Sequence, residues 1–107
     1  MFARRLSVQL KPNKLSEFTN ILENEVLPLL RKQDGFSDEI TLAKPNSTDI
    51  HAISLWDTQK NAEAYDGSAY KDVLKLLENV IAGVPKVVTT EVVHSTFQQT
   101  RPSVAAA

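Results

Sequence analysis

The sequence predicts a single α+β domain in which four strands and two helices follow one another in the order βαββαβ. Three observations support this. Polarity alternates over residues 2–10, two amphipathic helical stretches each follow a turn signal, and β-branched residues dominate the segment after the second stretch. A chain of 107 residues is long enough for one domain and too short for two.

The first strand is predicted over residues 2–10, because polar and apolar residues alternate there with the period of a half-buried strand. Most apolar members share one face with Arg4. The opposite face carries Ala3, Arg5, Ser7 and Gln9. The turn that follows ends the strand and offers Asn13 as a helix N-cap.

An amphipathic helix is expected next, because apolar residues recur there at spacings of three and four. They are Leu15, Phe18, Leu22, Val26 and Leu29. Pro28 lies inside this pattern and cannot donate a hydrogen bond to the carbonyl of Asn24, so we predict a kink there. Asp34 and Gly35 end the helix, and Gly35 suits the left-handed C′ position.

The second and third strands are predicted over residues 36–44 and 50–56. In the former, Phe36, Ile40 and Leu42 are apolar. The turn-forming cluster over residues 45–49 separates the two segments, so we expect them to form a hairpin. The third strand is almost continuously apolar, which favours cover on both of its faces.

A second helix is predicted after Asp57 or Thr58, either of which can cap its first turn. Gly67 interrupts this helix. An apolar helical face then resumes from Tyr70 onward. The sequence therefore predicts a helix broken near its middle.

The fourth strand is predicted over residues 87–97, which are rich in Val and Thr, after Gly83 and Pro85 end the helix. The complete order matches the ferredoxin-like split βαβ motif, a four-stranded antiparallel sheet with two helices on one face. We expect this domain to span residues 1–98, with a flexible tail over residues 99–107.

The predicted sheet has one face that its own helices do not cover. That face combines polar residues of the first strand with Val and Thr residues of the fourth. It is too apolar to remain in water and too polar for a dry core. Pairing with a second copy would cover it and enclose a ligand-sized cavity. We therefore expect a homodimer.

Composition excludes several classes of function. Twelve basic and thirteen acidic residues give a formal charge of -1, which provides no strong field for nucleic acid or an anionic membrane. No apolar run approaches the roughly 18 residues of a membrane span. The chain has no cysteine, so disulfides, thiolate metal sites and cysteine nucleophiles are excluded. This composition is compatible with the cytoplasm, where we expect the protein.

Two stretches resemble the antibiotic biosynthesis monooxygenase-like family. They are EVLPLLRKQDGF, residues 25–36, and SLWDTQKNAEAYDGSAYKDVLKLL, residues 54–77. The resemblance covers residues 2–97 and implies a dimeric α/β barrel built from two ferredoxin-like halves. Members of this superfamily include cofactor-free quinone-forming oxygenases, haem-degrading enzymes and isomerase-like proteins. The superfamily also includes stress-responsive barrels and members with no known activity.

The residues that haem-degrading members use are not matched. With Trp56 and the helix after it aligned, the tryptophan position of those enzymes falls on Tyr65 and the histidine position on Lys75. Their asparagine position falls near Arg4. A lysine amine is protonated at neutral pH and is a poor iron ligand. Haem degradation by that mechanism is therefore not expected.

His51 and His94 are the candidate catalytic bases, because histidine has an unperturbed pKa near neutrality. An oxygenase without a cofactor must take a proton from its substrate or accept an acidic phenol. His94 is preferred, since the resemblance places the fourth strand at the dimer seam. The alternative for each is a structural histidine on an apolar strand face. With no third ligand nearby, the pair predicts no metal site.

Five further residues are candidates for substrate binding. Trp56 and Tyr65 could form a wall that stacks on an aromatic ring, and a tyrosine hydroxyl can donate to a phenol or quinone oxygen. Their alternative is core packing. Arg5, Ser7 and Gln9 could orient a polar ligand, or could form a solvated sheet face or a polar part of the dimer interface.

We therefore expect a cofactor-independent monooxygenase of the antibiotic biosynthesis type, without metal or flavin, acting on a small phenolic or quinol-type aromatic. One alternative is a non-catalytic dimeric barrel of the stress-responsive type that binds a small hydrophobic metabolite. Another is isomerase- or lyase-like activity. The expected partners are a second copy of the chain and a small ligand.

Overall fold

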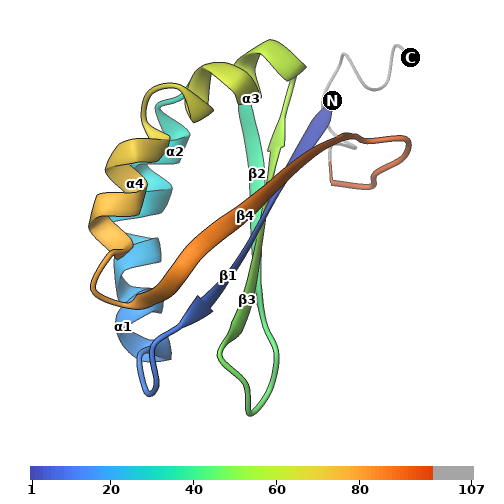
Figure 1. Cartoon of the computed structure of the whole chain (residues 1–107). Coiled ribbons are helices and arrows are strands. Elements are labelled where there is room, and N and C mark those ends of the chain that lie inside the picture. Colours follow the sequence, from blue (N-terminus) through green and yellow to red (C-terminus); the bar gives the residue numbers. More distant parts are fainter. Residues whose placement is uncertain (98–107) are drawn as a thin grey trace.

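The computed structural model describes residues 1–97, and the predicted tail over residues 99–107 lies outside the described residues. An antiparallel sheet in the order β2-β3-β1-β4 carries all the helices on one face (Figure 1). Its strands are β1 (Phe2–Leu10), β2 (Phe36–Ala43), β3 (Asp49–Trp56) and β4 (Ile81–Glu91). The helices are α1 (Leu15–Ile21), η1 (Leu22–Val26), α2 (Leu27–Arg31), α3 (Gln59–Asp66) and α4 (Tyr70–Leu77). The predicted ferredoxin-like α+β class is confirmed.

The first helical rod runs through α1, η1 and α2 without a break, and its middle turn is π-helical. The N–H of Leu27 bonds to the carbonyl of Leu22, which is the wider spacing that defines a π-helix. Pro28 follows directly and lacks the N–H that an α-helix would use. The disturbance predicted at Pro28 therefore appears as a π turn just before it. The predicted N-cap is wrong, because Asn13 has a left-handed φ of 62° and makes no cap.

The second helix is broken as predicted. Thr58 caps α3, since its side-chain oxygen accepts the N–H of Asn61 at 3.1 Å. The break between α3 and α4 is held by Ser68, whose hydroxyl donates to the carbonyl of Ala64 at 2.6 Å. Within residues 1–97, no helix is long and apolar enough to cross a membrane.

The predicted range of the fourth strand, 87–97, is wrong at both ends. Gly83 adopts a φ of +77°, and the strand continues through it and Pro85 along the sheet edge, where a proline costs no interior ladder bond. The far end of β4 is set by its partner, because Glu91 pairs with Phe2, the first residue of β1. Past that pair, the N–H of Val92 donates to the carbonyl of Met1 at 2.9 Å, and the chain then leaves the sheet.

The sheet has two very different faces. The helix-facing side holds the core, in which Trp56, Ile50 and Val80 are almost completely buried. The other side is called the open face here, because no helix covers it (Figure 1). Its exposed apolar side chains include Ile40 and Leu42.

Candidate functional site

Trp56 and Tyr65 lie together in the core. Their rings stack with centroids 5.0 Å apart and planes 28° from parallel, and Phe36 meets Trp56 edge-on at 5.6 Å. The indole N–H of Trp56 donates to Ser54 Oγ at 2.8 Å, so its polar atom is satisfied. Trp56 is fully buried and packs as a core residue, whereas Tyr65 also lines a cavity.

Arg5, Ser7, Gln9 and His51 lie on the open face, as their strand register requires. Ser7 Oγ and His51 Nδ1 are 3.1 Å apart, and Gln9 Nε2 donates to Asp49 Oδ1 at 3.1 Å. Except for Arg5, these residues help to line a groove of about 320 Å³ between β1, β3 and β4. The sheet separates this groove from Trp56 and Tyr65, so the predicted residues do not form one site.

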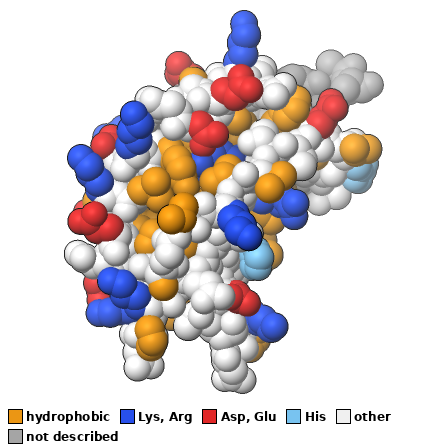
Figure 2. Space-filling model, viewed as in Figure 1, with side chains coloured by type: hydrophobic (Ala, Val, Ile, Leu, Met, Phe, Trp, Pro, Cys, Tyr) orange, Lys and Arg blue, Asp and Glu red, His pale blue; other side chains and the backbone are white. Residues whose placement is uncertain are grey.

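The predicted place of His94 on the fourth strand is wrong, because β4 ends at Glu91 and His94 follows it in an exposed segment. Figure 2 shows the histidine side chains on the side of the molecule that faces away from the helices. Among residues 1–97, no three His, Asp or Glu side chains cluster in a way that could hold a metal ion.

A cavity of about 50 Å³ lies between the sheet and the helices. Its helical walls are apolar and include Phe18, Leu22, Val26, Leu30, Val73 and Leu77. Five polar or aromatic side chains also line the cavity: Arg4, Glu39, Ser54, Tyr65 and Tyr70. Figure 2 shows hydrophobic side chains gathered between the helices and β4 on the surface that faces the viewer. A mainly apolar pocket with a few convergent polar groups is the usual form of a small-molecule site.

Three of the polar lining residues form a row across the sheet, and we call Glu39, Ser54 and Arg4 the polar row. The register pairs Glu39 of β2 with Ser54 of β3, and Ser54 with Arg4 of β1. Paired residues on neighbouring strands point to the same side of a sheet, so all three face the helices. Charged residues are rarely buried at such positions without a partner or a function.

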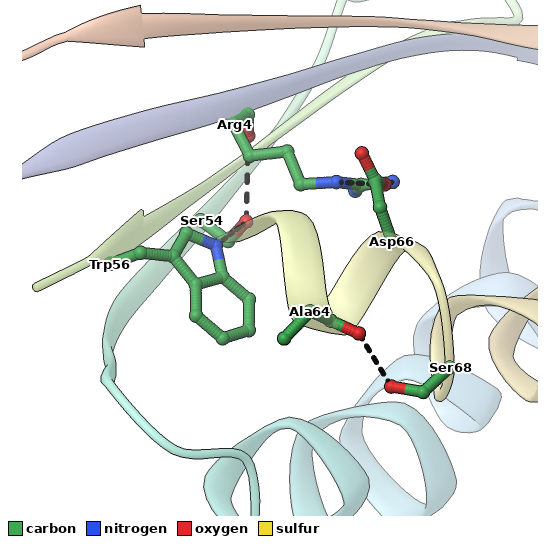
Figure 3. A network of polar contacts seen from close by, with 6 residues as sticks. All are labelled: Arg4, Ser54, Trp56, Ala64, Asp66 and Ser68. Atoms are coloured by element: carbon green, nitrogen blue, oxygen red, sulfur yellow. Dashed lines mark hydrogen bonds and ion pairs between the residues drawn. The ribbon is translucent and has the colours of Figure 1, made fainter. Parts of the chain in front are cut away.

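Arg4 is 3% exposed and has an incomplete set of partners. Its Nε donates to Asp66 Oδ1 at 2.8 Å (Figure 3). Its Nη2 lies 2.5 Å from the same oxygen as an ion pair, but this buried atom makes no hydrogen bond with any described residue. The guanidinium carbon lies 4.1 Å from the ring centroid of Tyr70 and 5.0 Å from that of Tyr65.

Burial governs the protonation of two cavity residues. It raises the pKa of Tyr65 to about 12, although the positive charge of Arg4 acts in the opposite direction. Burial also raises the pKa of Glu39, and the hydrogen bond from Thr41 to Glu39 Oε2 offsets part of this effect. Glu39 therefore holds a proton more strongly than a solvated carboxylate does.

Arg4 and Glu39 were missed by reasoning from the sequence. A signal for Arg4 was present, because it shares the face of the apolar residues of its strand. No such signal exists for Glu39. An irregularity in the pairing of β2 between Phe36 and Asp38 shifts the register. Phe36 meets Trp56 on the helix side, but beyond the irregularity Glu39 faces the helices and Ile40 the open face.

The sequence matches no protein-family model and no curated protein. The fold, in contrast, is similar to solved structures along most of the chain. A monooxygenase from the gene ActVA-Orf6 of Streptomyces coelicolor, in complex with the ligand nanaomycin D, is 15% identical with a TM-score of 0.74, and the match covers 88% of each chain. SnoaB, a cofactor-independent oxygenase from Streptomyces nogalater, is 9% identical with a TM-score of 0.73, covering 89% of this chain and 95% of that one.

A protein of unknown function from Nitrosomonas europaea is 14% identical with a TM-score of 0.73, and the match covers 89% of this chain and 91% of that chain. These similarities confirm the ferredoxin-like fold of the single chain that the resemblance to the antibiotic biosynthesis monooxygenase-like family implied. At such low identities they establish the fold and no chemistry.

Proposed function

We propose that this protein is a cofactor-independent monooxygenase of the antibiotic biosynthesis type, acting on a small phenolic or quinol-type aromatic in the cavity between the sheet and the helices. The observation that carries the proposal is the presence of Arg4, Glu39, Tyr65 and Tyr70 around an otherwise apolar cavity. Two solved structures with this fold are described as a monooxygenase and as a cofactor-independent oxygenase. They support the proposed reaction by analogy of fold, whereas the candidate residues are taken from the cavity of this chain alone.

In the proposed reaction, the substrate supplies all the electrons. A phenol reacts with dioxygen to give a quinone and water. One ring C–H bond breaks and that carbon gains a C=O oxygen from dioxygen, while the phenolic O–H becomes the second carbonyl. The other oxygen atom leaves as water with the two hydrogens. The ring donates an electron most readily as the phenolate, so the site needs a proton acceptor.

We assign the role of proton acceptor to Glu39. Among the described residues that line the cavity, it is the one carboxylate. Burial raises the pKa of Glu39, which brings it closer to neutrality and makes it a stronger base than a solvated carboxylate. Glu39 replaces His51 and His94 in this role, because neither histidine lines the cavity.

The test is oxygen consumption by the purified protein with a panel of mono- and dihydroxylated benzenes and naphthalenes. Glu39→Gln should lower the rate by about 10²-fold or more, as expected for the loss of a general base. The matched control is Glu25→Gln on the exposed side of η1, which should keep the wild-type rate. Consumption that survives Glu39→Gln but is lost in His51→Ala would contradict the assignment to the cavity. No consumption with any member of the panel would contradict the oxygenase itself.

We also propose that the protein is a homodimer that buries the open face. Leu42 and Val88 on that face are 47% and 50% exposed, and covering them would remove apolar surface from water. Light scattering coupled to gel filtration should report a dimer for the unsubstituted chain. The double variant Leu42→Glu with Val88→Glu should report a monomer. A monomeric unsubstituted chain would contradict this proposal.

A second candidate function is binding of a small hydrophobic metabolite without turnover. It is favoured by the apolar helical walls of the cavity, which would hold a hydrophobic molecule without the help of a reacting group. Thermal stabilisation by a ligand that is recovered unchanged in air would support this function. Conversion of a ligand without oxygen would instead indicate isomerase- or lyase-like activity.

A further inference from the structure

We propose that the cavity between the sheet and the helices is an anion site, in which Arg4 binds the negatively charged oxygen of a small aromatic ligand. This inference rests on the proposed function, because it names the charge state of the substrate in the same cavity. It does not require turnover, so it can be tested by binding alone.

The first argument is the incomplete bonding of Arg4. An arginine side chain carries five N–H donors. The Nε donor is used by Asp66, and the buried Nη2 lies 2.5 Å from the same oxygen as an ion pair. Nη2 carries two N–H groups and has no hydrogen-bond partner with suitable geometry among residues 1–97, so at least one of these N–H groups is left without an acceptor. A buried donor without an acceptor lowers the stability of the ligand-free protein. A ligand oxygen in the cavity would supply the missing acceptor, and a charged oxygen would make the stronger hydrogen bond.

The second argument is the way in which the guanidinium is enclosed. Tyr70 and Tyr65 both lie within 5.0 Å of the guanidinium carbon, measured to their ring centroids. Arginine stacks on aromatic rings through its flat faces and donates hydrogen bonds from its edge. The two rings exclude water from the guanidinium without accepting its edge hydrogen bonds, so the N–H groups that Asp66 does not use are left for a ligand. This arrangement suits a ring oxygen that approaches in the plane of the guanidinium.

The third argument is the balance of charge around the cavity. Asp66 pairs with Arg4, but its side chain is 43% exposed and so is partly solvated. Glu39 accepts a hydrogen bond from Thr41, and burial raises its pKa and so disfavours its charged form. Once Glu39 has accepted the proton of the substrate it is neutral, and Arg4 is then the one charged side chain among the described residues that line the cavity.

The fourth argument concerns room for a ring. The cavity holds about 50 Å³, less than one aromatic ring needs. Tyr70 is only half-buried and begins α4, directly after the break that follows α3. We expect the ring of Tyr70 to turn outward when a ligand ring enters, which leaves Tyr65 beside the guanidinium.

The experiment uses para-nitrophenol, whose phenolate is yellow and whose phenol is colourless. A nearby arginine lowers the pKa of the bound probe, and a decrease of about one unit raises the ratio of phenolate to phenol tenfold at a fixed pH. The wild-type chain should show this increase on binding. Arg4→Met keeps the length of the side chain and removes its charge, so it should lose the increase. Arg31→Met, on the exposed side of α2, is the matched control and should keep it.

A neutral probe separates loss of charge from loss of the cavity. Para-nitroanisole has nearly the same shape but no ionisable hydroxyl, so the wild type and Arg4→Met should bind it equally. An increase in phenolate that survives Arg4→Met would overturn the proposal. So would an increase that is lost in Arg5→Met instead, because Arg5 lies on the open face. Failure of the wild type to bind either probe would also overturn it.

The outcomes for turnover and for binding are independent. If no substrate consumes oxygen but the phenolate increase depends on Arg4, the anion site stands and the oxygenase is refuted. If oxygen is consumed and Arg4→Met changes neither the rate nor the phenolate increase, the oxygenase stands and the anion site is refuted.

Discussion

Replacing Arg4 by methionine should leave the free energy of unfolding nearly unchanged, even though the arginine is charged and 3% exposed. The variant loses an ion pair with Asp66, whose side chain is 43% exposed, and such half-solvated pairs contribute about 1 kcal/mol or less. It also loses contacts of the cation with two tyrosine rings, each about 1 kcal/mol. A methionine sulfur beside the same rings restores about half of that contribution.

The opposing gains are of the same size. Removing Nη2 also removes an N–H group that the ion pair with Asp66 leaves without an acceptor, which recovers about 1–3 kcal/mol. This gain is the part of the cost of burying the guanidinium that its partners do not offset, so that cost is not counted a second time. The two sides cancel to within about 1 kcal/mol, so we expect a folded variant that has lost its anion site.

The assay is equilibrium unfolding in urea followed by fluorescence. The chain has a single tryptophan, Trp56, which is fully buried and so reports on the core. Asp66→Asn provides the contrast, because it leaves the buried guanidinium of Arg4 without its carboxylate and should cost about 2 kcal/mol or more. A loss of about 3 kcal/mol or more in Arg4→Met would refute the reasoning, because Arg4 would then be required for stability.

Three further predictions concern stability. Burial raises the pKa of Glu39 in the folded chain, so the stability that its protonated form contributes is lost as pH rises from the ordinary pKa of 4.5 through the raised value. Glu39→Gln should flatten this decline in urea titrations across the same pH range. An unchanged slope would contradict the prediction. Burial raises the pKa of Tyr65 from 10.0 to about 12, so the free energy of unfolding should fall as pH rises between these values. Tyr65→Phe should reduce this alkaline loss of stability in the same titrations, and an equal loss in both proteins would show that Tyr65 is solvated. Gly35→Ala should lower the free energy of unfolding by about 1–3 kcal/mol, because Gly35 has a φ of +77° and the new Cβ would lie 2.2 Å from Asn61 Oδ1. A thermal midpoint equal to that of the wild type would count against this prediction.

Local patterns in the sequence were sufficient to predict the elements and their order. The alternation over residues 2–10 and the helical spacing that begins at Leu15 are read from neighbours along the chain. The break at Gly67 is equally local, because it depends on the conformational preferences of a few adjacent residues. The common face of Ser7 and Gln9 also followed from the period of a strand.

The limits of β4 and the place of His94 were not predicted, because a strand extends only as far as its partner. The residues after Gly83 have strand-like composition on both sides of Glu91, and only the pairing of Glu91 with Phe2 decides where the ladder stops. His94 therefore lies outside the sheet because of the pairing of β4 with β1, which is distant from His94 in the sequence.

The sequence by itself determined the fold class of this protein, because the periods of strands and helices are local properties of the chain. Only the tertiary structure decided the composition of the candidate site. Glu39 faces the helices because the register of β2 shifts, and it lies in one row with Arg4 because both strands pair with β3. Register is set by contacts between distant segments, and a shift of one residue exchanges the two faces of a strand. For that reason the site had to be read from the folded sheet.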